Sequence, residues 1–199
     1  MWSWEEVTHG SADSKAVCGI SKQTGVHANR AKANEAGSVQ AVNGCAGKGQ
    51  CVFGDDLVNE IIAKAKEADG FVFGSPVYYA HPSGQVLSLL DRLFYAGGGA
   101  FTHKPGAAVV TARRAGTTAS LDVLNKYMTD AQMPVVTSTY WNMVFGPAPE
   151  LVERDKEGLQ TMRNLGRNMA WLLKCIQAGA QQGVTPPAAE TEHWTNFNR

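Results

Sequence analysis

The chain has 199 residues, enough for one domain with a substantial buried core. Its 18 basic and 18 acidic residues cancel at pH 7, so no excess positive charge indicates binding to nucleic acid or to an anionic membrane surface. The sequence has no run of about 18 apolar residues and no apolar segment behind a basic start, so neither a membrane span nor a secretion signal is predicted. We expect a cytoplasmic protein without nucleic-acid or membrane partners.

Four cysteines are spread along the chain, at Cys18, Cys45, Cys51 and Cys175. They form no C-x-x-C pair and are too few for a disulfide scaffold in a domain of this size. Structural zinc or an iron–sulfur cluster needs four closely spaced ligands, of which Cys45 and Cys51 provide two. We therefore expect free thiols and no bound metal.

The first 44 residues differ in composition from the rest of the chain. They contain no leucine and no phenylalanine and are rich in alanine, serine, glycine, asparagine and lysine. Such a segment offers little material for a buried strand. We treat residues 1–199 as a single domain in which 1–44 is atypical, and we expect regular helices and strands from about Cys45.

Residues 52–70 predict a helix, with apolar side chains on one face, two aspartates at its start and Gly70 as its stop. The short apolar run 71–74 predicts a strand buried on both faces. A second helix is predicted to begin near Ser83 and to end at the glycines 97–99.

The same alternation continues along the chain. Residues 107–111 predict a strand, 113–118 its exit loop, and Ser120 the cap of the following helix. The segment 133–146 is rich in β-branched and aromatic residues, which favours a third strand. Apolar residues repeat at helical spacing from 159 to 176, which predicts a last long helix.

Strands that alternate with helices indicate βαβ units and a parallel sheet, so the fold class is α/β. Residues 180–199 form a polar C-terminal tail that also contains Trp194 and Phe197. We expect this tail either to wrap the body of the domain or to reach a neighbouring subunit.

The loop from Gly74 to Gly84 is the first candidate site, because ligands of open parallel sheets lie beyond the carboxyl ends of the strands. Its glycines and prolines favour a stiff turn, and Tyr78 and Tyr79 provide flat aromatic surface. A flavin ring needs such a surface together with a few backbone donors and acceptors. The alternative is that both tyrosines are half-buried at a subunit contact.

The loop 111–118 is the second candidate site, because Arg113 and Arg114 follow the end of a predicted strand. Their guanidinium groups suit negative charge on a reduced flavin or a phosphate of NAD(P)H. The alternative is that both are solvated surface arginines. The sequence has no G-x-S-x-G, H-E-x-x-H, G-x-G-x-x-G or Walker motif, which disfavours hydrolytic, zinc and Rossmann-type dinucleotide sites.

Several short motifs follow one another in a fixed order: Cys51-Val52-Phe53, Asp55-Asp56, Gly74-Ser75-Pro76-Val77-Tyr78, Gly84-Gln85, Asp91-Arg92 and Lys104-Pro105. From about Cys45 to the C-terminus this series resembles the flavodoxin-like NAD(P)H-dependent FMN reductases, a group related to the iron–sulfur flavoproteins. The resemblance implies a three-layer sandwich whose five-stranded parallel sheet has the order 2-1-3-4-5, with helices on both faces.

The resemblance also implies an activity. In such proteins FMN receives electrons from NAD(P)H and passes them to a small-molecule acceptor such as a flavin or a quinone. It further implies a homodimer or homotetramer in which the neighbouring subunit helps to close the flavin site. Two other functions remain open: a flavodoxin-like electron carrier, although carriers are usually acidic and this chain is neutral, and a flavin-free structural subunit.

The resemblance assigns cofactor contacts to two loops and to the N-terminal segment. The residues concerned are Ser75, Pro76, Val77, Tyr78 and Tyr79 for the flavin ring, Ala112, Arg113, Arg114 and Gly116 for further contacts, and Ser11 for the phosphate. Ser11 is included because Gly10-Ser11 is the trace of a phosphate loop that the family places at a helix N-terminus. Cluster-bearing members place several cysteines before the Cys-Val-Phe motif, where this chain has Cys45, so no iron–sulfur cluster is expected.

Overall fold

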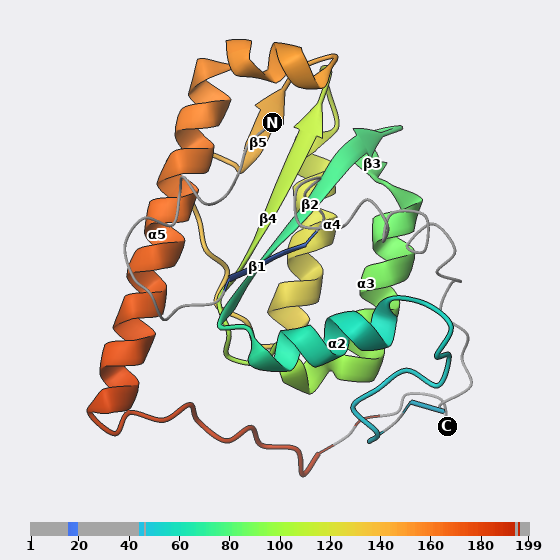
Figure 1. The fold of residues 1–199 in the computed structure, drawn as a ribbon, viewed down its shortest axis with the longest axis vertical. Coiled ribbons are helices and arrows are strands. Elements are labelled where there is room, and N and C mark those ends of the chain that lie inside the picture. The colour runs from blue at the N-terminus through green and yellow to red at the C-terminus, as the bar shows by residue number, and fades with distance from the viewer. Residues whose placement is uncertain (1–15, 20–43, 46, 194, 196–199) are drawn as a thin grey trace.

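A computed structural model describes residues 16–19, 44–45, 47–193 and 195 of the chain. Within these residues a central sheet lies between helices on both of its faces (Figure 1). The predicted α/β class with helices on both faces is confirmed. Ser11 and most of the atypical segment 1–44 lie outside the described residues. No helix in the described part is long and apolar enough to cross a lipid bilayer.

Four parallel strands form the sheet, and they lie side by side in chain order: β1 (Ala16–Gly19), β2 (Gly70–Tyr78), β4 (Gly106–Ala112) and β5 (Met143–Phe145). The two-residue strand β3 (His81–Pro82) folds back antiparallel on the end of β2.

The prediction of five parallel strands in the order 2-1-3-4-5 was wrong for the described residues. That order requires a strand on the outer edge of β1, and the described residues pair none there. The fifth strand of the observed sheet is β3, which is antiparallel because a tight turn at Tyr79 and Ala80 reverses the chain directly. A parallel neighbour would need a long crossover instead.

The prediction that 133–146 forms one strand was also wrong. Val135 makes a single bridge to Gly106, and regular pairing resumes at Met143. At Thr137 a side chain takes the place of a neighbouring strand, since the Asn168 amide donates to the Thr137 carbonyl at 2.8 Å. That bond satisfies the carbonyl away from the sheet, and β5 begins only at Met143.

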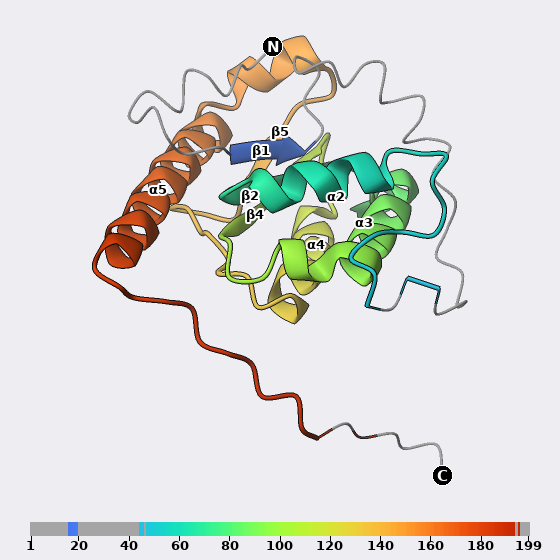
Figure 2. The same ribbon diagram turned by 60° about the horizontal axis from the view of Figure 1, so that its bottom comes forward.

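In the described part of the chain four α-helices cover the sheet: α2 (Val58–Glu67), α3 (Gly84–Gly97), α4 (Thr117–Asp130) and α5 (Lys156–Gln181). Short 3-10 segments, η2 (Gly98–Ala100) and η3 (Pro149–Arg154), follow α3 and precede α5. The end-on view shows α5 on one face of the sheet and the other three helices on the opposite face (Figure 2).

Alternate side chains of β2 enter two separate cores. Phe71 and Phe73 pack with the apolar faces of α2, α3 and α4. Val72 points to the other face, where it packs with Leu165 and Met169 of α5. This arrangement confirms that the segment around 71–74 is a strand buried on both faces, as a parallel strand between two helical layers must be.

The predicted helix boundaries hold for α3 and fail for two other helices. Ser83 caps α3, since its hydroxyl accepts a hydrogen bond from the Val86 amide. Ser120 caps nothing, because α4 begins at Thr117 and buries Ser120 within its first two turns. The predicted helix 52–70 begins only at Val58 and ends at Glu67. The Asn59 side chain binds the backbone N–H and C=O of Cys51, which holds the preceding residues in a loop.

The described part of the C-terminal tail extends away from the domain (Figure 2). Residues 182–193 are all exposed. This part of the tail therefore does not wrap the body, which was one of the two arrangements expected from the sequence.

A buried ion pair joins α3 to the segment before α2. The side chains of Arg92 and Asp56 are only 5% and 6% exposed, and the Arg92 guanidinium donates to the Asp56 carboxylate. A second donation reaches the Cys51 Sγ at 3.1 Å, and the guanidinium lies 5.4 Å from the centre of the Phe53 ring. Burial lowers the pKa of Arg92, but its bonds to Cys51 and Asp56 outweigh this effect, so that its pKa is raised overall.

Replacing Arg92 with alanine is expected to lower the free energy of unfolding by about 3–5 kcal/mol, because Asp56 would keep a buried and unpaired charge. Urea unfolding followed by circular dichroism measures the change. The matched control is Lys64→Ala, which removes the exposed Lys64–Glu60 pair on α2 and should cost at most about 0.5 kcal/mol. Equal losses in the two variants would contradict the role assigned to Arg92.

Candidate functional site

The carboxyl ends of β2 and β4 bring the two predicted loops to one edge of the sheet. In the parallel register Ser75 lies opposite Val110 and Pro76 lies opposite Thr111. The chain therefore leaves both strands at the same level. At this edge the loop after β2 and the loop 113–116 after β4 are neighbours in space, although about 35 residues separate them in sequence.

The loop after β2 contains two strained residues. Tyr79 and Ala80 have φ angles of 50° and 59°, in the left-handed region that residues with a Cβ rarely adopt. The pairing of Tyr78 with His81 on β3 holds them there. Strain of this kind persists only where the surrounding structure enforces it, and it is concentrated at ligand-binding sites.

Ser75 secures this loop from inside. Its side chain is buried, and its hydroxyl donates to the Pro76 carbonyl at 2.8 Å and accepts from the Ser83 amide at 2.9 Å. The hydroxyl thus ties the end of β2 to the first turn of α3. Because its donor and one acceptor site are already used, Ser75 acts as a support for the loop more readily than as a ligand for a cofactor.

Gly116 brings the two loops into direct contact. Its φ of 89° is left-handed, and a Cβ built on it would lie 2.3 Å from the Cα of Ala80. A residue with a side chain is therefore disfavoured here for two reasons: the left-handed backbone conformation and the close approach of Ala80. The strained turn after β2 and the N-terminus of α4 are held together by this close approach.

The exposed surface of the edge is aromatic and cationic. Tyr79 is fully exposed and Tyr78 is 61% exposed, while Arg113 and Arg114 are exposed on the adjacent loop. Pro76 is exposed and Val77 is half-buried, whereas Ala112 is buried beneath them. The structure thus brings nine of the ten predicted site residues to one edge. The tenth, Ser11, lies outside the described residues.

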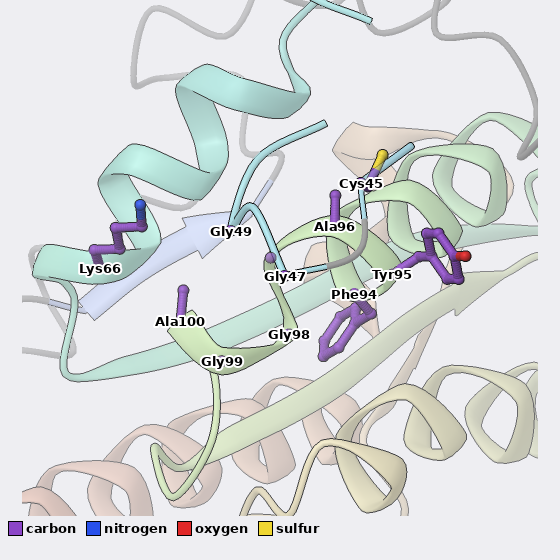
Figure 3. A pocket seen from close by; sticks show the side chains of 11 residues that line it. Cys45, Gly47, Gly49, Lys66, Phe94, Tyr95, Ala96, Gly98, Gly99 and Ala100 are labelled. Carbon is purple, nitrogen blue, oxygen red and sulfur yellow. The ribbon is translucent and has the colours of Figure 1, made fainter. Parts of the chain in front are cut away.

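Two cavities of the described residues lie away from this edge. One, of about 480 Å³, lies beside the last turn of α3 and the loop 45–49 (Figure 3). The other, of about 620 Å³, lies between Phe94 of α3 and the outer face of α4. Neither is lined by a predicted site residue. The candidate site is therefore an open edge built from two loops.

Solved structures of other proteins have the same fold. A WrbA-like flavodoxin from Agrobacterium tumefaciens superposes with a TM-score of 0.54 at 17% identity, over 81% of this chain and 98% of that protein. An NADH:FMN oxidoreductase in its apo form gives a TM-score of 0.51 at 14% identity, over 79% and 87% of the two chains. The fold is therefore the flavodoxin-like α/β fold, as predicted, apart from the strand count and order corrected above.

Sequence comparison identifies the family. The chain belongs to the NADPH-dependent FMN reductase family, whose sequence model matches residues 29–148. An iron-sulfur flavoprotein of Methanocaldococcus jannaschii is 36% identical over 143 residues, which cover 68% of this chain and 74% of that protein. An iron-sulfur flavoprotein of Methanosarcina thermophila is 29% identical over 149 residues, or 72% and 75% of the two chains. The family places this chain among FMN-binding oxidoreductases.

The described residues fit the ring of FMN. The edge combines exposed aromatic rings, the apolar Pro76 and Val77, and a turn whose backbone is held in a strained form by its neighbours. These are the features that a flat, fused ring with a polar rim requires. The guanidinium groups of Arg113 and Arg114 add positive charge, which suits an anionic cofactor.

The described residues do not fit an iron–sulfur cluster held by four cysteines. Cys45 and Cys51 lie in the loop before α2, whereas Cys175 is exposed on α5, which covers the opposite face of the sheet. Within the described part of the chain no three His, Cys, Asp or Glu side chains come together as a metal site. We derive no chemistry through such a cluster.

Several motif residues turn out to belong to the scaffold. Asp56 and Arg92 form the buried pair, and the Asp91 carboxylate accepts a hydrogen bond from the Tyr127 hydroxyl, whose pKa is raised by burial and by that carboxylate. The Lys104 ammonium donates to the carbonyl of Ala65 at 2.7 Å and so caps the C-terminus of α2. Burial lowers the pKa of Lys104.

One sequence signal could have revealed the buried pair. Arg92 lies directly between buried leucines of α3, on the face that packs into the core. A charged residue within an apolar helical stripe needs a buried partner. The sequence does not say which of the several acidic residues is that partner, because pairs so far apart in the chain leave no local pattern.

Replacing Gly116 with alanine is expected to lower the free energy of unfolding by at least about 1–2 kcal/mol, the cost of a left-handed alanine alone. The contact with Ala80 adds to this cost and separates the two loops. The control is Gly84→Ala, whose Cβ would meet open space in the first turn of α3, so its stability should be unchanged or about 1 kcal/mol higher. Thermal and urea unfolding distinguish the two outcomes, and a fully stable Gly116→Ala protein would refute the close approach.

Proposed function

We propose that this protein transfers electrons from NAD(P)H, through FMN, to a small-molecule acceptor. The observation that carries the proposal is the contact between Gly116 and Ala80, which joins the strained aromatic loop of β2 to the arginine loop of β4. The family supports FMN as the cofactor. The choice of NAD(P)H as the donor and of a small acceptor rests on the chemistry of the exposed edge.

The flavin ring binds against the loop after β2 in this proposal. Tyr78 and Tyr79 provide exposed rings, and Pro76 and Val77 provide apolar contact. Ser75 holds the loop on α3 by its two hydrogen bonds. When bound, FMN supplies reversible two-electron chemistry that no side chain of the protein offers. The protein contributes the rigid surface that orients it.

Arg113 and Arg114 recognise the pyridine nucleotide. Both are exposed, and both follow the end of β4 at the edge where the flavin ring is placed. A guanidinium binds phosphate oxygens through two parallel hydrogen bonds, which makes arginine better suited than lysine to this task. The same charges stabilise negative charge on the reduced cofactor.

A second copy of the chain completes the site in this proposal. Tyr79 is fully exposed and the edge is open, so one face of a ring bound there would meet solvent. Burying 70–90% of a ligand surface is usual for cofactor sites. A homodimer or homotetramer in which a neighbouring subunit covers this face meets that requirement.

Loading the purified protein with FMN is expected to give a yellow holoprotein whose absorbance near about 450 nm bleaches when NADPH or NADH is added without oxygen. The double variant Arg113→Ala/Arg114→Ala should bind FMN more weakly, because the positive charge at the edge is lost, and should also show a raised KM for the nucleotide. Stopped-flow absorbance measures both. Colour without bleaching would indicate an electron carrier, and a protein that takes up no FMN would indicate a flavin-free subunit.

The tyrosines can be tested separately from the nucleotide. Tyr78→Ala is expected to weaken FMN binding by roughly 1–3 kcal/mol, because the ring would lose an aromatic contact. The control is Tyr95→Ala, a tyrosine in the last turn of α3 that is 51% exposed, and this change should leave FMN affinity unchanged. Quenching of flavin fluorescence on titration gives both dissociation constants. Equal affinity in the two variants would count against the ring site.

A further inference from the structure

Cys45 and Cys51 lie at the base of one short loop. The Val52 amide donates to the Cys45 Sγ at 3.4 Å, and the Lys48 amide donates to the Cys45 carbonyl at 3.1 Å. Because Val52 directly follows Cys51, the Cys45 sulfur lies beside the backbone of the second cysteine. The chain thus brings the Cys45 side chain back to the peptide that follows Cys51.

Both thiols are buried, and one of them has a cationic partner. Cys45 is 7% exposed and Cys51 is 5% exposed. The Cys51 Sγ accepts a hydrogen bond from Arg92, whose guanidinium is fixed by its bond to Asp56. This contact fixes the position of the Cys51 sulfur at one side of the loop.

A cavity gives small molecules access to one thiol only. The cavity of about 480 Å³ is lined by Cys45 but not by Cys51 (Figure 3). Five glycines of its wall expose backbone rather than side chains. Among the described residues that line the cavity, Lys66 is the one with a charged side chain, and none carries a carboxylate. A small anionic molecule therefore fits the cavity better than a cationic one.

We propose that Cys45 and Cys51 form a thiol–disulfide exchange pair whose oxidant is an anionic low-molecular-weight disulfide of the glutathione type. The Cys45 thiolate attacks one sulfur of the small disulfide, forms a mixed disulfide and releases one thiolate. The Cys51 thiolate then attacks the Cys45 sulfur and releases the second thiolate. The pair loses two electrons and two protons, and the small disulfide becomes two thiols.

This pair is separate from the proposed FMN site. Cys45 lies beside the last turn of α3 and Cys51 contacts Arg92 in the middle of that helix, while the loops of the FMN site lie beside its first turn. Its test measures thiols, so the result is the same whether or not the protein binds flavin. The misfit of a four-cysteine cluster leaves both thiols available for exchange.

The experiment uses full-length Cys175→Ser protein, which removes the exposed cysteine on α5. The protein is treated with oxidised glutathione, remaining thiols are alkylated, and the product is digested with trypsin without reduction. Lys48 lies between the two cysteines, so trypsin separates them into peptides 33–48 and 49–64. We expect these peptides to be joined by a disulfide that dithiothreitol releases.

Single variants test the order of the steps. Cys51→Ser should retain one glutathione on Cys45, and Cys45→Ser should leave Cys51 unmodified over the same time. Lys66→Glu should slow the reaction severalfold with oxidised glutathione but not with the neutral hydroxyethyl disulfide. The exposed Lys64→Glu is the matched control and should slow neither reaction.

Three results would overturn the proposal. The first is complete alkylation of both cysteine peptides, with no linked product, in the Cys175→Ser protein. This result does not depend on whether the other variants fold. The second is glutathione on Cys51 in the Cys45→Ser variant with native circular dichroism. The third is iron and acid-labile sulfide bound in stoichiometric amounts after anaerobic purification.

Discussion

The parallel pairing of β2 with β4 is the interaction on which the candidate site depends. It runs from Phe71–Gly106 to Pro76–Thr111, and it fixes the level at which each strand ends. A slip of one residue would turn Phe71 and Phe73 from one helical layer to the other and would move both loops. The burial of both strand faces therefore sets the geometry of the edge where FMN is proposed to bind.

The buried pair of Arg92 and Asp56 provides the second constraint. It joins α3 to the loop before α2, and the same guanidinium binds the sulfur of Cys51. A pair of this kind adds little net stability compared with apolar residues, but its loss leaves a buried charge. It holds residues 51–56 against α3, because one guanidinium donates both to the Asp56 carboxylate and to the Cys51 Sγ.

Local features were predictable from the sequence, and long-range ones were not. Helical spacing and the Ser83 cap gave α3, and apolar runs gave β2 and β4, because these signals lie within a few residues. The short β5 and the start of α4 at Thr117 depend on contacts made after folding. The edge was predictable because parallel strands end together, whereas Gly116 and Ala80 are too far apart in sequence for their contact to leave a local pattern.

Helix α3 contacts both proposed sites, at different points along its length. Its first turn is tied to the β2 loop through Ser75 and Ser83, and its last turn borders the cavity beside Cys45. Its 14 residues span about 21 Å at 1.5 Å per residue. Both proposed sites therefore act on small molecules that approach one helix at different points. For the thiol pair, the open, cation-bearing cavity beside Cys45 is the feature that admits an oxidant from solvent.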